Sequence, residues 1–445
     1  MRSVVALLFL CGALAPGSNG PIVSGPGANP AATPGATAVS PSDDRAPVPV
    51  PEPGEKAIRF YRSGNVLWCL RTLWEVAVPA AILFTGFSAR IRDRAERIGR
   101  RWFFVVVIYL VTFMAVKYLL DWPLNCYQGF LRQHAYGLSR QSFGRWLGNS
   151  LKHLAVDTSG YVAFLWFPYL LMRKCPQRWW LHSWLAATAA ALFVVLITPI
   201  WIDPWFNQFC PMKNKALEAD ILALAERAGI EGSRVFEVDQ GADTKAVNAY
   251  VTGFMGTKRI VLWDTIIAKL NRRELLTVMG HEMGHYVLGH VAKGMLFGAA
   301  LGFFGIYLFS RLSGRLIGRF QGRFGFDSVS NIASFPLILL FVSAGNLALD
   351  PLILAFSRHL EHEADRFGLE ITRDNRAAAN AFVKLQSENL GVPRPGLMYT
   401  LCRATHPSPG GRIDFANTYR PWAKGEPLSY EHLFKAARSD KVATP

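Results

Sequence analysis

Long apolar segments constrain the fold of this chain more than any other feature of its sequence. Six of them approach the roughly 20 residues that a helix needs to cross the hydrocarbon core of a bilayer. They lie at about 66–88, 102–121, 158–173, 181–202, 291–312 and 332–357. The third is short, and the last is interrupted at Asp350-Pro351, where proline favours a kink. The sequence therefore predicts an integral, multi-pass membrane protein with about six spans.

The composition agrees with a membrane protein. Of the 445 residues, 51% are apolar and only 18% are charged, which is unusual for a soluble enzyme of this size. The net charge of +16 would suit nucleic acid binding, but the arginines concentrate in short segments between the apolar runs. Such segments orient a membrane protein, so we expect a lipid bilayer as partner and no nucleic acid. The six cysteines include no CxxC pair and indicate neither a disulfide framework nor a thiolate metal site.

The N-terminal region differs from the rest of the chain. Residues 1–15 begin with Met1-Arg2 and continue into a short apolar stretch, which predicts a signal peptide or a weak anchor. Residues 16–55 are rich in Pro, Gly and Ala and have no periodic apolar face, so we expect a disordered linker. Residues 56–202 then contain four spans and are expected to form an N-terminal transmembrane region.

Three arginine-rich loops indicate the orientation of the spans. They lie between spans one and two, three and four, and five and six, and so fall on one side of the membrane. Their basic residues are Arg90, Arg92, Arg94, Arg97, Arg100, Arg101, Arg173, Lys174, Arg178, Arg311, Arg315, Arg319 and Arg323. Short cytoplasmic loops are enriched in Lys and Arg, so the remaining loops are expected outside. In a bacterial inner membrane, which the composition suggests, that is the periplasmic face.

The long polar stretch between spans four and five, residues 203–290, predicts a small α+β unit. Residues 214–229 show helical periodicity that ends at a glycine. Val235 to Val238 and Arg259 to Trp263 have the composition of strands, and Asn248 to Thr252 fits an edge strand. A second helix is expected to begin at Asn271, with Glu274 as its capping-box partner.

This second helix carries the sequence His281-Glu282-Met283-Gly284-His285. Two histidines four residues apart lie on one face of a helix, so both imidazoles can reach one zinc ion. Zinc lowers the pKa of its bound water toward about 7. The glutamate between the histidines can accept the proton of this water and deliver it to a leaving amine. The motif predicts two metal ligands, His281 and His285, and a general base, Glu282.

A catalytic zinc site needs a third protein ligand and one open position. His290 is one candidate, but its spacing from His285 does not match the extended metzincin pattern. Glu361 is the other, and Asp365 lies four residues further along the expected helix, where it can accept the outer N–H of a ligand histidine. The last two spans form a hairpin, which returns both segments to the same membrane face. We therefore predict Glu361 as the third ligand and leave the role of His290 open.

These residues resemble the integral-membrane CAAX prenyl protease type I family of zinc metallopeptidases and, more loosely, the related membrane heat-shock peptidases. The similarity covers roughly residues 66 to 420. It rests on HEMGHYVLGH at 281–290, SRHLEHEAD at 357–365, NAY at 248–250 with KRIVLWDT at 258–265, and Thr405-His406-Pro407 with Arg412-Ile413. The resemblance implies one zinc ion held by His281, His285 and Glu361, with Glu282 as base and Asp365 behind the ligands.

The resemblance also implies two roles for residues outside the metal ligands. Asn248 would lie on an edge strand that pairs with the substrate backbone, and His406 would approach the site to stabilise the oxyanion or bind substrate. The expected fold is mainly α, a polytopic helix bundle with a small α+β zincin-type (gluzincin) catalytic domain. Residues 203–445 would form this metallopeptidase domain, including spans 291–312 and 332–357.

The predicted function is hydrolysis of peptide bonds in membrane-associated or lipidated peptides and proteins by a zinc metalloendopeptidase. One departure from the family bears on the substrate, because a linker and a signal-like segment stand where the eukaryotic members have their first span. An outward-facing site would not meet prenylated C-termini, which are made in the cytosol. The alternatives are a quality-control protease of membrane proteins and a membrane transporter that binds metal through the same residues.

Overall fold

The computed structural model describes residues 46–435 except 242, 245–246 and 254–257. The predicted signal peptide and most of the predicted linker therefore lie outside the described residues. The main helices are α2 (Glu55–Phe84), α3 (Phe87–Gly99), α4 (Trp102–Cys126), α5 (Arg132–Ala135), α6 (Phe143–Lys174), α7 (Trp179–Ile197), α8 (Lys215–Arg227), α9 (Asp264–Lys269), α10 (Arg272–Val287), α11 (His290–Phe324), α12 (Phe335–Thr372), α13 (Asn375–Glu388), α14 (Leu397–Cys402), α15 (Pro409–Thr418) and α16 (Pro421–Lys424).

Within the described residues, six helical segments are long and apolar enough to cross a membrane, in agreement with the predicted number of spans. They are Glu55–Phe84, Trp102–Ala135, Phe143–Lys174, Trp179–Trp205, His290–Phe324 and Ile332–Thr372. The segment at Asp350-Pro351 does not end a helix, since α12 continues through it. Large apolar side chains such as Leu192, Phe193 and Leu296 are exposed on these helices, as expected of surfaces that face lipid.

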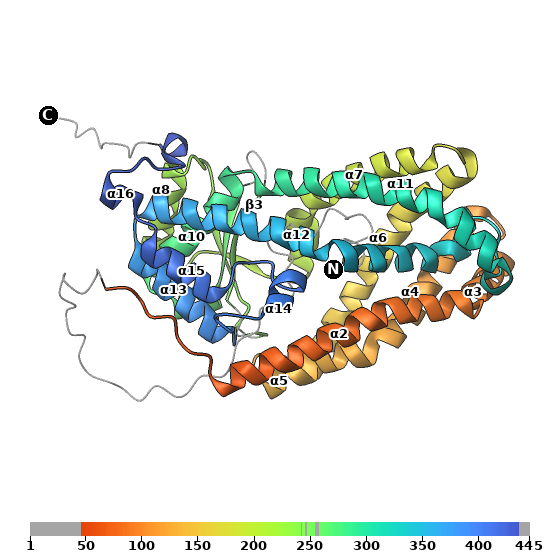
Figure 1. The fold of residues 1–445 in the computed structure, drawn as a ribbon, viewed down its shortest axis with the longest axis horizontal. Coiled ribbons are helices and arrows are strands. Elements are labelled where there is room, and N and C mark those ends of the chain that lie inside the picture. The colour runs from red at the N-terminus through yellow and green to blue at the C-terminus, as the bar shows by residue number, and fades with distance from the viewer. Residues whose placement is uncertain (1–45, 242, 245–246, 254–257, 436–445) are drawn as a thin grey trace.

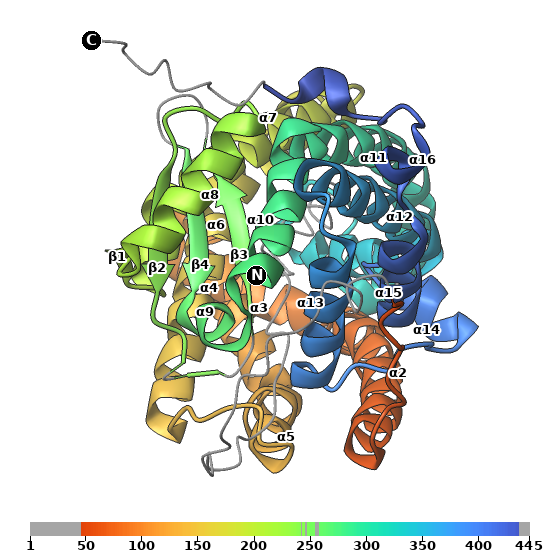
Figure 2. The same ribbon diagram turned by 90° about the vertical axis from the view of Figure 1, so that its left-hand side faces the viewer.

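The small domain is built on a four-stranded sheet at one end of the bundle (Figure 1). Its strands are β1 (Phe209–Pro211), β2 (Arg234–Val238), β3 (Ala249–Thr252) and β4 (Arg259–Trp263), in the order β1-β2-β4-β3. β2 pairs parallel with β4, and β3 pairs antiparallel with β4 and forms an edge of the sheet, as predicted. Figure 2 shows α10 beside β3, with α12, α13 and α15 on the other side of α10.

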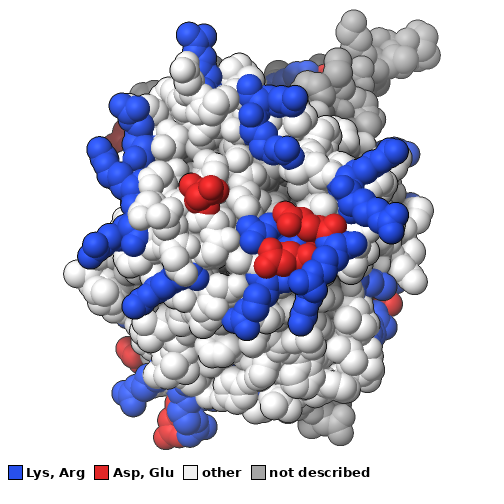
Figure 3. Space-filling model, turned by 90° about the vertical axis from the view of Figure 1, so that its right-hand side faces the viewer, with Lys and Arg blue, Asp and Glu red and all other residues white. Residues whose placement is uncertain are grey.

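The arginine-rich segments meet at the opposite end of the bundle. Arg92 of α3 donates a hydrogen bond to the carbonyl of Gly325 after α11, at 3.3 Å. The guanidinium of Arg173, at the end of α6, lies 5.0 Å from the ring centroid of Trp102. Figure 3 shows this end, where Lys and Arg side chains surround a few acidic ones. The sheet and the basic segments therefore lie at opposite ends of the spans.

The last residues of the predicted linker are held on the small domain. Val48 is buried beside Phe382 and Ile413, although this segment was expected to be disordered. Its backbone N–H donates to Asn417 Oδ1 at 2.9 Å, and Asn417 Nδ2 donates to the Val48 carbonyl at 2.8 Å. The two hydrogen bonds and the buried valine fix the segment that leads into α2. The composition of this segment alone indicated no partner.

Candidate active site

Helix α10 places His281 and His285 toward one point. Its N-terminus has the predicted capping box, in which the Asn271 side chain accepts from the Glu274 backbone and the Glu274 side chain accepts from the Asn271 backbone. Both histidines are buried, and their Nε2 atoms lie 3.1 Å apart. Two unprotonated Nε2 atoms would repel one another at this distance, so the pair is suited to a shared cation.

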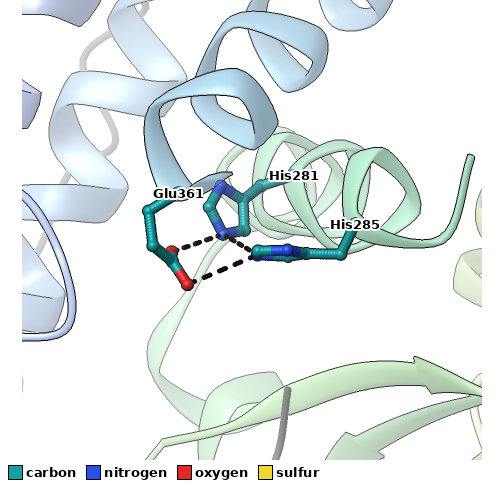
Figure 4. A group of neighbouring side chains, drawn as sticks. All are labelled: His281, His285 and Glu361. Atoms are coloured by element: carbon teal, nitrogen blue, oxygen red, sulfur yellow. Dashed lines mark hydrogen bonds and ion pairs between the residues drawn. The ribbon is translucent and has the colours of Figure 1, made fainter. Parts of the chain in front are cut away.

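Glycines let α12 cross α10 closely enough to complete the site. A Cβ built on Gly368 would lie 2.8 Å from the His281 backbone nitrogen, and one on Gly284 would lie 3.1 Å from Phe367 Cβ. With no side chains at these positions, the two helix backbones come into direct contact. This crossing brings the carboxylate of Glu361 beside both imidazoles (Figure 4).

The three side chains fit one metal ion. Glu361 Oε2 lies 3.4 Å from His281 Nε2, and Glu361 Oε1 lies 3.6 Å from His285 Nε2. Ligand atoms about 2.0–2.1 Å from a tetrahedral zinc ion lie about 3.3 Å apart, which these distances approach. Glu361 Oε2 is buried and faces histidine nitrogens, but no hydrogen bond of good geometry reaches it. Among the described residues this is the group whose His, Cys, Asp or Glu ligand atoms converge in this way.

Asp365 and Arg412 lie behind His281. Asp365 Oδ1 is 2.8 Å from His281 Nδ1, on the side of the ring that faces away from Glu361. Arg412 donates from Nε and Nη2 to the two oxygens of Asp365, at 2.9 and 2.6 Å. Burial lowers the pKa of His281, but hydrogen bonds to Asp365 and Glu361 outweigh it and raise the pKa to about 10.

His290 contacts His285, a contact that the spacing of the two residues in the sequence did not reveal. Its Nδ1 lies 2.8 Å from His285 Nδ1, and its Nε2 lies 3.3 Å from Glu363 Oε2. Lys293 Nζ donates to the same Glu363 oxygen at 2.9 Å. Gly289 makes this contact feasible, because its positive φ of 65° turns the chain between α10 and α11. His290 is not among the converging metal-ligand atoms.

His406 reaches the site from the segment between α14 and α15. Its Nε2 lies 3.1 Å from Glu361 Oε2, and its Nδ1 lies 2.8 Å from Thr405 Oγ1. About a third of the side chain is exposed, in contrast to the buried His281 and His285. The imidazole therefore lies between the three converging groups and solvent.

Glu282 lies on α10 and Asn248 lies just before β3, the two elements that border the site. Burial raises the pKa of Glu282, and the neighbouring His281 and His285 lower it in part. Asn248 directly precedes β3, and its carbonyl accepts from the Trp263 backbone N–H at 3.0 Å. The helix that carries Glu282 packs against this edge strand. The buried carboxyl of Glu282 and the edge strand β3 thus border the three converging side chains.

Two family models match the chain. Residues 211–420 match the model described as peptidase family M48, and residues 55–208 match the model described as CAAX prenyl protease N-terminal, five membrane helices. The second region contains α2, α3, α4, α6 and α7. Together the two matches span nearly all of the described residues.

Individual proteins give the same assignment. The uncharacterized metalloprotease YhfN of Bacillus subtilis is 33% identical over 372 residues, which are 82% of this chain and 86% of that protein. CAAX prenyl protease 1 of Saccharomyces cerevisiae is 26% identical over 324 residues, 68% of this chain and 70% of that protein. The crystal structure of S. mikatae Ste24p shares the fold, with a TM-score of 0.70 at 21% identity over 81% of this chain and 87% of that one. The chain therefore belongs to peptidase family M48 and is an integral-membrane metalloprotease related to the CAAX prenyl proteases.

Proposed function

We propose that this protein is a zinc endopeptidase that cuts membrane-associated or lipidated peptides and proteins at the site formed by α10 and α12. The family implies a metal ion, typically zinc. The observation that carries the proposal is the convergence of His281, His285 and Glu361 within 4.8 Å of one another, with a glutamate between the histidines. The donor set of two imidazoles and one carboxylate suits a catalytic zinc with one open position.

The remaining residues have separate roles in this proposal. Bound zinc would supply Lewis acidity, which polarises a peptide carbonyl and lowers the pKa of a bound water toward about 7. Glu282 accepts the proton of the attacking water and later gives it to the leaving amine. Asp365 holds the proton on His281 Nδ1 and thereby fixes the tautomer that offers Nε2 to the metal. His406 lies at the exposed side of Glu361, where it can donate to the developing oxyanion.

The free edge of β3 suits an extended peptide. A substrate strand that pairs with this edge, beginning beside Asn248, would lie along the helix that carries Glu282. The basic end of the bundle supports a cytoplasmic location for that end and a periplasmic location for the site in a bacterial inner membrane. Substrates would then be membrane-associated peptides on the outer face, with or without a lipid group.

Cleavage of two quenched peptides, one farnesylated and one not, by the detergent-purified protein tests the proposal. We expect cleavage that a chelator abolishes and added zinc restores, and a fall of about 100-fold or more in Glu282→Gln. Retention of zinc by Glu282→Gln is the control for folding. Undiminished cleavage by this variant would refute the mechanism. Cleavage of the farnesylated peptide alone would favour maturation of prenylated proteins, whereas equal cleavage would favour quality control.

A further inference from the structure

Helix α11 is longer than the bilayer that it crosses. Its 35 residues span about 52 Å, whereas the hydrocarbon core of a membrane is about 30 Å thick. In Figure 1 the helix runs from the small domain to the basic end of the bundle. Its apolar run ends at Arg311, about 20 residues after the helix begins, which is the length that one crossing needs. The helix therefore leaves the hydrocarbon core near Arg311 and continues beyond it.

The exposed side chains before this point are apolar. Leu296, Phe304 and Leu308 are 73%, 66% and 50% exposed, as expected of a surface that contacts acyl chains. Tyr307 lies at the end of this surface, and the Arg311 guanidinium lies 5.6 Å from the centroid of its ring. Tyrosine is enriched at the membrane–water interface, so this pair agrees with a boundary near Arg311.

Beyond the boundary, arginines repeat every four residues along α11. Residues four apart are neighbours on one side of a helix, so these side chains form a single row. The opposite side of the helix, which includes Ile317 and Phe324, is buried in the bundle. All members of this arginine row are exposed, and they are Arg311, Arg315, Arg319 and Arg323.

Acidic side chains of the described residues do not neutralise the arginine row. Helix α11 contains neither Asp nor Glu, and in the described part of the chain no carboxylate oxygen lies within 4.0 Å of these guanidinium groups. Helix α3 does carry Asp93 and Glu96, but both pair with Arg92, at 2.7 and 3.9 Å. Like charges four residues apart on a helix repel one another, so an anion bound at the row would stabilise it.

Glycines leave the helix accessible between the arginines. Gly314 and Gly318 directly precede Arg315 and Arg319. Outside the backbone of the helix itself, no heavy atom lies within 4 Å of a Cβ built on either glycine. A bulky group can therefore approach the backbone of α11 beside the guanidinium groups.

We propose that this face of α11 binds an anionic phospholipid of the adjacent leaflet, with acyl chains along Phe304 and Leu308 and the phosphate between Arg311 and Arg315. The two arginines are separated by about 6 Å along the helix axis, so both can reach one phosphate. Their forked N–H donors match phosphate oxygens. A zwitterionic headgroup would bring its own cation beside the row and is disfavoured. The continuity of the row with the lipid-facing surface favours a lipid over a soluble anion.

Native mass spectrometry of the protein in neutral detergent tests the inference, with phosphatidylglycerol and phosphatidylcholine of identical acyl chains as probes. For the first bound lipid we expect phosphatidylglycerol to be preferred by about tenfold or more, since each basic residue near the surface contributes about fivefold. The double variant Arg311→Gln with Arg315→Gln should lose most of this preference. Arg94→Gln with Arg97→Gln removes the same charge from exposed positions on α3 at the same end and should keep it.

Gly314→Leu is a second variant that leaves every charge in place. Its side chain enters open space and suits a helix, so the fold should be preserved while access to the phosphate position is reduced. We expect a loss of preference of about fivefold, and no loss in Gly148→Leu on α6, whose Cβ position is also open. Binding is measured without cleavage, so the result does not depend on the peptidase proposal.

Three results would overturn the inference. One is equal retention of the two lipids by the wild type. Another is an equal loss of preference in the α3 and α11 double variants, or none in Gly314→Leu, because the attraction would then belong to the basic end as a whole. The third is displacement of phosphatidylglycerol by equimolar glycerol phosphate, which would make a soluble phosphate compound the ligand.

Discussion

Each histidine of the converging pair has a partner on the side of its ring that faces away from Glu361. His281 has Asp365, which is itself held by Arg412, and His285 has His290. Such outer partners select the tautomer of a ligand imidazole and hold its ring in place. The network around His281 carries a carboxylate next to the ring, whereas the one around His285 carries a second imidazole. The two histidines therefore have outer partners of different charge.

Zinc binding should release a proton from His281. The pKa of this residue is raised to about 10 in the metal-free site, because the hydrogen bonds to Asp365 and Glu361 outweigh the effect of burial. At pH 7.5 the ring is therefore protonated, and zinc must displace that proton. We expect about one proton released from His281 per zinc, and an affinity that weakens as the pH falls below about 10. The number of protons released per zinc ion is measured by titrating metal-free protein with zinc in a calorimeter, in buffers of different ionisation enthalpy.

The Asp365→Asn variant is the check on this assignment. Loss of the carboxylate removes the interaction that raises the pKa of His281, so fewer protons should be released at the same pH. Asp414→Asn, at a half-exposed carboxylate that pairs with Arg394, is the matched control. The same proton count in wild type and Asp365→Asn would show that the raised pKa has another origin.

His406→Phe should lower kcat far more than it lowers zinc affinity. The side chain lies 3.1 Å from Glu361 but is not one of the three converging groups, and its partly exposed position suits a donor to the oxyanion. Loss of one oxyanion donor typically costs about 100- to 1000-fold in kcat. Steady-state kinetics with zinc content measured in parallel test this, and His432→Phe at an exposed position serves as control. Loss of zinc along with activity would assign His406 to metal binding instead.

At the scale of elements, the site depends on the crossing of α10 and α12. The sequence predicted both helices, the capping box of α10 and the return of the final hairpin to the same membrane face. It did not predict how closely the helices approach, because Gly280, Gly284 and Gly368 acquire meaning only once the two helices are packed together. The contact of His290 with His285 was hidden for a similar reason, since it depends on the turn at Gly289.

Other elements were missed because they are defined by distant parts of the chain. β1 has only three residues and includes a proline, and it exists through its pairing with β2. The segment around Val48 is ordered by Asn417, which is 369 residues away in the sequence. Composition and periodicity describe local preference, so neither contact could be read from them.

The Gly368→Ala substitution should separate the two helices and weaken metal binding. Its Cβ would lie 2.8 Å from the His281 backbone nitrogen, which is closer than such atoms approach in proteins. We expect lower thermal stability and at least about tenfold weaker zinc binding, since 1 Å displacements at a site are costly. Gly318→Ala on α11 is the matched control, because nothing lies within 4 Å of its Cβ position. Unchanged zinc affinity in Gly368→Ala would show that the close crossing does not position Glu361.

At the scale of the whole molecule, the spans separate two chemically different ends. One carries the sheet and the converging side chains of His281, His285 and Glu361, and the other carries the basic segments of α3, α6 and α11. Short cytoplasmic loops of membrane proteins are enriched in Lys and Arg. We therefore expect the basic end to face the cytoplasm and the end with the site to lie outside. The fold alone allows either orientation, and the orientation decides which peptides can reach the site.

Reporter fusions in a bacterial inner membrane determine this orientation. We expect alkaline phosphatase fused after residue 435 to be active, and green fluorescent protein inserted at residues 176–177, between α6 and α7, to fluoresce. Replacing Arg90, Arg94 and Arg97 by Gln should weaken the bias, because the positive charge near the membrane sets it. Fluorescence from a fusion after residue 435 would place the site in the cytoplasm. Cytosolic C-termini, including prenylated ones, would then become the accessible substrates.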